Sequence, residues 1–95
     1  MAKHDTPAIR RLARQLDSLS DKLSSTEKSA SREITNTSND MLGDTPKAIN
    51  EAMTKLSSEL KTIRSGLSRY ASTLYQYANE LDIADAKVQS MINSK

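Results

Sequence analysis

The fold of this chain is decided by residues 49–91, which read INEAMTKLSSELKTIRSGLSRYASTLYQYANELDIADAKVQSM. Apolar residues recur there every seven positions along two rows. The first, which we call the leucine row, consists of Met53, Leu60, Leu67, Leu74, Leu81 and Val88. The second, the tyrosine row, consists of Ile49, Leu56, Ile63, Tyr70, Tyr77, Ala84 and Met91. A heptad repeat sustained this long indicates one helix in a left-handed coiled coil. We therefore predict a helix-packing seam whose centre consists of Met53, Leu56, Leu60, Ile63, Leu67, Tyr70, Leu74 and Tyr77.

A turn precedes this helix at Met41, Leu42 and Gly43. Glycine tolerates the left-handed conformation that ends many helices, and proline favours the first turn of a helix. The triplet Asp-Thr-Pro follows the turn at residues 44–46 and also occurs at residues 5–7. We therefore predict a first helix over residues 6–41, a turn over 42–45 and a second helix over 45–93. The first helix carries its own apolar stripe, formed by Ile9, Leu12, Leu16, Leu19 and Leu23. The sequence predicts an all-α, antiparallel two-helix hairpin that forms a single domain over residues 1–95.

A hairpin of this kind has only one seam, which is little apolar burial for a chain of 95 residues. Pairing of two hairpins into a four-helix bundle would bury the rest of the apolar stripe. Small residues beside the seam, Gly66, Ala71 and Ala78, would let a helix of the other hairpin come close. The sequence therefore predicts association with a second helical hairpin.

The composition argues against catalysis and against metal or cofactor binding. The chain has one histidine and no cysteine, and His4 lies close to the N-terminus, where a solvated side chain is expected. No pair of histidines or thiolates can hold zinc, and no glycine-rich phosphate loop is present. We expect no enzyme activity, no cofactor and no metal site.

Neither nucleic acid nor membrane insertion is expected. The formal net charge is only +2, and the basic cluster Arg10, Arg11 and Arg14 lacks interleaved aromatic residues, so we interpret it as a solvated helix face. No apolar run is long enough to span a membrane, and the N-terminal residues lack the apolar core of a secretory signal. Export, if it occurs, is expected to follow a route that needs no signal peptide.

The turn and the C-terminal end resemble motifs of the WXG family, the early-secreted-antigen-like helical hairpins of type VII secretion. The family turns at Trp-x-Gly, where this chain has Met41-Leu42-Gly43. The family's export motif spaces one apolar residue, one acid and two further apolar residues as Leu81, Asp85, Val88 and Ile92 are spaced here. Because methionine replaces the tryptophan, the resemblance implies a divergent member, such as the small partners that accompany LXG-type toxins.

The resemblance implies a protein that is cytoplasmic before export and is then secreted. It implies pairing with another helical hairpin, either a second copy or the N-terminal domain of an LXG-type toxin, and recognition by a type VII secretion ATPase. Two other functions remain open. Subunits of secretion needles are also small helical hairpins, and these would form filaments as concentration rises. A cytoplasmic coiled-coil adaptor associated with nucleic acid would show binding that depends strongly on salt.

Overall fold

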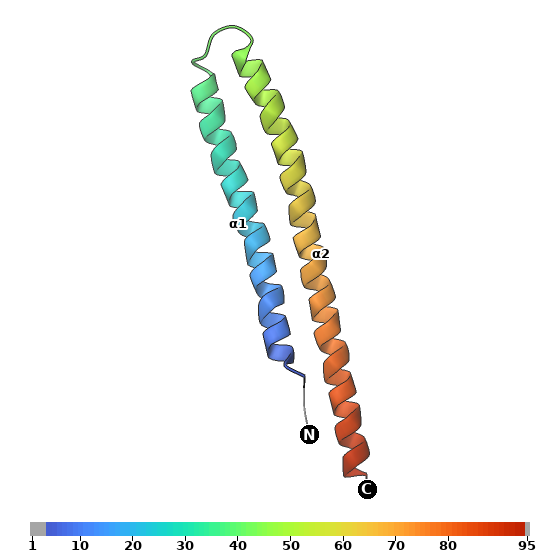
Figure 1. Cartoon of the computed structure of the whole chain (residues 1–95). Coiled ribbons are helices and arrows are strands. Elements are labelled where there is room, and N and C mark those ends of the chain that lie inside the picture. Colours follow the sequence, from blue (N-terminus) through green and yellow to red (C-terminus); the bar gives the residue numbers. More distant parts are fainter. Residues whose placement is uncertain (1–3, 95) are drawn as a thin grey trace.

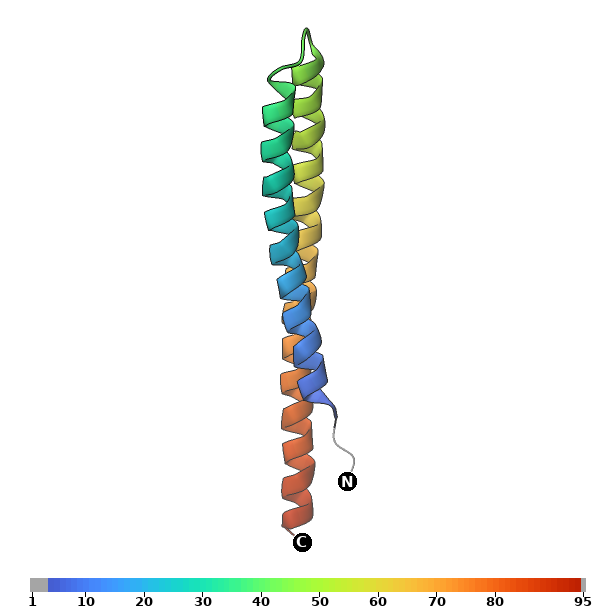
Figure 2. The same ribbon diagram turned by 90° about the vertical axis from the view of Figure 1, so that its left-hand side faces the viewer.

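The computed structural model describes residues 4–94 and consists of two antiparallel helices joined by one turn (Figure 1). Helix α1 spans Thr6–Ser38 and helix α2 spans Thr45–Asn93. The prediction of an all-α helical hairpin is confirmed. The two helices cross over one another and form a narrow rod (Figure 2), and the Cα atoms extend 81 Å along its long axis.

A capping side chain stabilises the start of α1, and a glycine lies in the turn between the helices. The Asp5 side chain accepts a hydrogen bond of 3.2 Å from the backbone N–H of Ala8, which satisfies a free donor at the start of α1. Gly43 has φ of 68°, a left-handed conformation that favours glycine. The conformation of the turn therefore depends on having glycine at position 43.

Helix α1 ends at Ser38, three residues before the predicted end at Met41. The Ser38 hydroxyl donates a hydrogen bond of 3.2 Å to the carbonyl oxygen of Thr35. The last residues of α1 are mostly serine, threonine and asparagine, whose side chains compete for backbone hydrogen bonds and weaken a helix. The predicted helix was therefore too long at this end.

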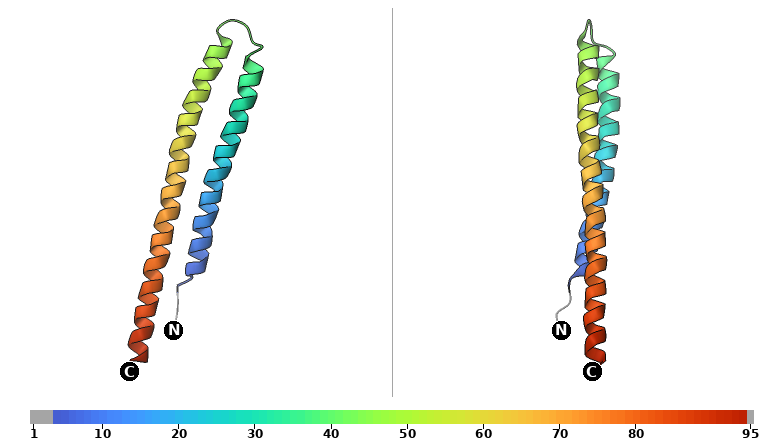
Figure 3. Two further views of the ribbon diagram at one scale, coloured as in Figure 1. Left: turned by 180° about the vertical axis from the view of Figure 1, so that it is seen from behind. Right: turned by 90° about the vertical axis from the view of Figure 1, so that its right-hand side faces the viewer.

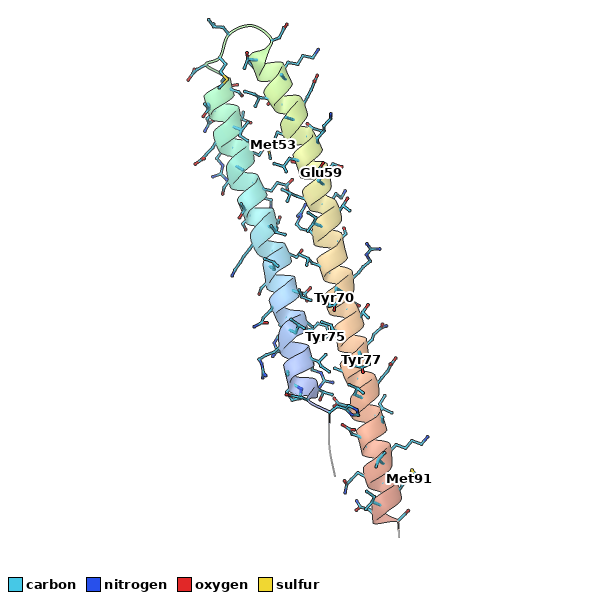
Figure 4. All side chains as sticks on the ribbon, in the orientation of Figure 1. Met53, Glu59, Tyr70, Tyr75, Tyr77 and Met91 are labelled. Carbon is cyan, nitrogen blue, oxygen red and sulfur yellow. The ribbon has the colours of Figure 1, made fainter. Side chains whose placement is uncertain are left out.

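Small side chains bring the two helices into contact. Ala13 of α1 and Ala71 and Ala78 of α2 have exposed fractions of 0%, 1% and 0%. Met53 lies between the two helices near the turn (Figure 4). Ala71 and Ala78 were expected to admit a helix from another hairpin, but α1 of the same chain occupies this place. That expectation was wrong: all three alanines are buried within the single hairpin, where small side chains let its own two helices approach closely.

Polar side chains occupy the middle of the contact between the helices. Arg64 of α2 lies 3.3 Å from the carboxylate of Glu27 on α1, and its backbone carbonyl accepts a hydrogen bond from Ser20. The buried Nε atom of Arg64 has no hydrogen-bond partner among the described residues. Because the Arg64–Glu27 ion pair is only partly buried and such pairs add little net stability, the contact between the helices has little apolar packing at this level.

Helix α2 continues beyond the N-terminal end of α1, as views from behind and from the other side show (Figure 3). We call this segment, residues 86–93, the overhang. Met91 lies on it, past the point where α1 begins (Figure 4). Among the described residues, neither helix contains a stretch apolar enough to serve as a membrane span.

Candidate protein-interaction surface

From Leu56 to Tyr77, the tyrosine row of α2 does not pack on α1. The exposed fractions of Ile63, Tyr70 and Tyr77 are 51%, 60% and 52%, whereas Leu60, Leu67, Leu74 and Leu81 of the leucine row are partly buried. The predicted single seam is therefore divided, and Leu56, Ile63, Tyr70 and Tyr77 are not part of the contact within the hairpin.

Helix α1 covers a different row of residues on α2, and this explains why the predicted seam is divided. Residues three positions apart on a helix diverge by about 60°, and residues four apart by about 40°. The residues four positions after the leucine row are Ser57, Arg64, Ala71, Ala78 and Asp85. Helix α1 packs between the leucine row and this small, polar row, which turns the tyrosine row outward.

Helix α1 adds two leucines to the same side of the hairpin. Leu12 and Leu19 are 44% and 45% exposed and lie one heptad apart. Glu33, three heptads after Leu12, and Ile49 of the tyrosine row line one shallow cavity of about 250 Å³. The row of Leu12 and Leu19 on α1 and the tyrosine row on α2 therefore lie along the same side of the hairpin. We call this side the apolar face; it consists of Leu12, Leu19, Leu56, Ile63, Tyr70 and Tyr77.

The opposite side of the hairpin is polar. Arg10 of α1 reaches across to α2, where its guanidinium lies 2.5 Å from the Asp82 carboxylate and 2.9 Å from the Asn79 side-chain oxygen. Further along this side, the lining of a shallow groove includes Lys61, Ser65 and Ser68. The hairpin thus has one polar side and one apolar face. The interpretation of Arg10 as a solvated residue was wrong, because its guanidinium pairs with Asp82 and its side chain is only 30% exposed.

The turn residues are divided between a cavity and solvent. Met41 helps to line the cavity beside Ile49, together with Ile34 and Thr37 of α1. Leu42, in contrast, has an exposed fraction of 89%. Of the three predicted turn residues, Gly43 carries the unusual backbone conformation, and Leu42 extends the exposed apolar surface to the tip of the rod.

A polar clasp joins the start of α1 to α2. The backbone N–H of His4 donates a hydrogen bond of 3.1 Å to one oxygen of Asp85, and its Nδ1 atom lies 2.8 Å from the other oxygen. The Thr6 hydroxyl donates a hydrogen bond of 2.7 Å to Asp82. His4 was expected to be solvated; its side chain is indeed 52% exposed, and it also contacts Asp85.

The clasp lowers the pKa of both acids. The hydrogen bond from Thr6 is the main cause for Asp82, followed by that from Arg10, and the hydrogen bonds from His4 are the main cause for Asp85. A carboxyl whose pKa is lower in the folded chain than in the unfolded chain stabilises the fold while it is ionised. This stabilisation is complete above the ordinary pKa of 3.8 and is lost as the pH falls below it.

We expect the double substitution Asp82→Asn and Asp85→Asn to reduce the pH dependence of stability in acid. Melting temperatures measured between about pH 5 and pH 2.5 should fall less steeply for the variant than for the natural chain. Asp21→Asn, on the exposed surface of α1, is the control and should keep the natural slope. Equal slopes for the natural chain and the double variant would show that the clasp does not contribute to stability.

The predicted export motif extends past the end of α1. Leu81 is partly buried against α1 and Asp85 is engaged by His4. Val88 and Ile92 lie on the overhang and are 43% and 50% exposed. The four residues share one side of α2, since they are spaced by three or four positions. Half of the motif is thus covered within the hairpin and half is displayed.

No family of proteins matches this chain, and neither a curated protein nor a solved structure is similar to it at a significant level. Within residues 4–94, no group of three acidic or histidine side chains is arranged to hold a metal ion. The apolar face and the displayed half of the motif are the features on which a function can be argued.

Proposed function

We propose that this protein is an interaction partner that binds another helical hairpin through its apolar face. The exposure of the tyrosine row carries this proposal. Large apolar side chains at strict heptad spacing are suited to the groove of a neighbouring helix pair. Single exposed apolar residues are ordinary on protein surfaces, but a continuous stripe marks an interaction site.

We further propose that the bound pair is cargo of a type VII secretion system, as the resemblance to the WXG family implies. Three features support this role: the single turn with glycine at its third motif position, the length of α2, and the display of Val88 and Ile92 on the overhang. A helix end that is free of α1 offers the exporter an apolar edge beside the fixed charge of Asp85. The protein acts by binding, with no chemical step.

Secretion by a bacterium that carries a type VII system tests this role. The double substitution Val88→Ser and Ile92→Ser should lower the exported fraction at least about tenfold, because it removes the apolar edge without touching the hairpin interior. Ile83→Ser is the matched control, since Ile83 is exposed on α2 outside the motif. It should leave export at the natural level. Natural export of the double variant would refute the role of the motif.

A further inference from the structure

We infer that the polar side of the hairpin carries a binding site for a small polyanion with two or three linked phosphate groups. The site lies where Arg64 of α2 meets Glu27 of α1, and Lys28 and Lys61 border it from the two helices. The inference goes beyond the proposed function, because the site lies away from the apolar face and a partner hairpin bound there would leave it open.

Two shallow cavities meet at Arg64, which lines both of them. One has a volume of about 560 Å³, and its lining includes Ser24 and Lys28 of α1. The other has a volume of about 520 Å³, and its lining includes Lys61 and Ser68 of α2. We call the two cavities together the cationic groove.

Both cavities open on the polar side of the hairpin. The cavity that contains Lys61 is the shallow groove of that side. In the other cavity, Ser24 and Ser31 lie two and three heptads after Arg10, which reaches across the polar side to Asn79. Residues at heptad spacing share one side of a helix in a coiled coil. The cationic groove and the apolar face therefore lie on opposite sides of the hairpin.

Positive charge is concentrated in the cationic groove. Glu27 is the one acid among the described residues that line it. Five cations line it, namely Lys28, Arg32, Lys61, Arg64 and Arg69. The whole chain has a formal net charge of only +2, so the rest of the chain is net negative. This uneven distribution attracts an anion to the groove rather than to the rod as a whole.

Arg64 has hydrogen-bond donors that the hairpin leaves unused. Its Nη2 atom lies 3.3 Å from the Glu27 carboxylate, which is longer than the roughly 2.7–2.9 Å of a charge-assisted hydrogen bond. Its Nε atom is buried and has no partner within residues 4–94. A buried donor without an acceptor is unfavourable, and a guanidinium binds phosphate through two parallel N–H groups. A phosphate oxygen beside Arg64 would supply the missing acceptor.

Lys28 and Lys61 are placed to bind the same ligand. The Arg10–Asn79 hydrogen bond sets the level of the two helices, and eighteen residues further along each helix Lys28 is level with Lys61. Both side chains are exposed, and neither takes part in an ion pair with another described residue. Arg64 lies one helical turn from Lys61. Three cations from two helices thus surround one site, which suits linked phosphate groups better than a single one.

Hydroxyl groups line much of the rest of the cationic groove. They belong to serines of both helices, which include Ser24, Ser31, Ser57, Ser65 and Ser68. Serine is a mediocre residue inside a long helix, because its hydroxyl competes for backbone hydrogen bonds. A hydroxyl beside a phosphate group donates a hydrogen bond to it. The site therefore gives these serines a role that the hairpin itself does not.

Isothermal titration calorimetry with sodium tripolyphosphate at constant ionic strength tests the site. We expect Lys28→Gln combined with Lys61→Gln to lower the affinity at least about tenfold, because two of the three cations are lost. Lys22→Gln combined with Lys55→Gln is the matched control, since it removes one exposed lysine from each helix outside the groove. The control should keep the affinity within about twofold of the natural value. An equal loss in both double variants would overturn the groove as the site.

Glu27→Gln should change the affinity in the opposite direction. This variant removes the acid that competes with the ligand for Arg64, so it should bind tripolyphosphate at least about threefold more tightly than the natural chain. Unchanged or weaker binding by Glu27→Gln would overturn the placement of the ligand at Arg64.

Titrations of the natural chain with other anions identify the chemistry of the ligand. Inorganic phosphate should bind at least about tenfold more weakly than tripolyphosphate, and equal affinity would overturn the requirement for linked groups. ATP that binds more tightly than tripolyphosphate identifies a nucleotide as the source of the phosphates. Equal or weaker binding of ATP identifies an inorganic phosphate chain.

Two results would overturn the inference as a whole. One is the absence of any tripolyphosphate binding up to about 10 mM. The other is tighter binding of a short single-stranded DNA than of tripolyphosphate, which would make nucleic acid the occupant of the groove. Neither result bears on the proposed function, because the apolar face lies on the other side of the hairpin.

Discussion

Ala71→Leu is expected to destabilise the hairpin by about 1–3 kcal/mol. Ala71 is 1% exposed and is buried in the contact between α2 and α1. Three additional carbon atoms at this position must push the helices apart or adopt strained rotamers. Separation of the helices would also expose the partly buried leucines on either side, so the effect belongs to the upper part of this range.

Urea unfolding followed by helical circular dichroism measures this effect. Ala86→Leu provides the control, because Ala86 is exposed on the overhang and has no helix of the same chain beside it. This substitution should change the free energy of unfolding by less than about 0.5 kcal/mol. If Ala71→Leu costs no more than the control, α1 does not pack against the row that contains Ala71 and Ala78.

The course of the chain could be predicted from a few residues. Proline fixes the first turn of a helix, glycine permits the left-handed turn, and these two types occur only twice each in the chain. Gly43 and Pro46 therefore placed the bend between the two helices. The end of α1 was harder to predict, because a run of serine, threonine and asparagine weakens a helix gradually and contains no single stop signal.

Periodicity could not predict which side of α2 faces α1. A seven-residue repeat marks the leucine row and the tyrosine row equally, and it says nothing of the row that contains Ala71 and Ala78. The choice depends on how closely two helices can approach, which is a property of facing pairs such as Ala13 with the alanines of α2. The sequence did mark Ala71 and Ala78 as small residues that admit a helix, but it could not show that this helix is α1 of the same chain.

The clasp also could not be predicted from the sequence. His4, Asp82 and Asp85 have no periodic pattern, and their contacts depend on the level at which α1 begins beside α2. His4 and Asp85 are 81 residues apart in the sequence, so no local sequence pattern could predict their contact. In contrast, the spacing of Val88 and Ile92 within the export motif was visible, and the structure adds that these two residues are displayed.

Tyr70→Asp is expected to weaken binding of the partner hairpin to the apolar face at least about a hundredfold. Tyr70 is 60% exposed in the hairpin, so an aspartate there is solvated in the single chain and does not disturb the contact with α1. In the bound pair of hairpins this charge is buried among apolar residues and has no partner. An uncompensated buried charge costs about 3–5 kcal/mol, which corresponds to more than a hundredfold in affinity.

Sedimentation equilibrium over a range of concentrations measures this loss. Ser65→Asp is the control, because it adds the same charge on the polar side near Lys61 and Arg69 and should associate as the natural chain does. The melting temperature of the natural chain should rise with the concentration of the partner hairpin, and that of Tyr70→Asp should not. If Tyr70→Asp associates with natural affinity, then the tyrosine row is not the interface, and the outward rotation of these side chains has another cause.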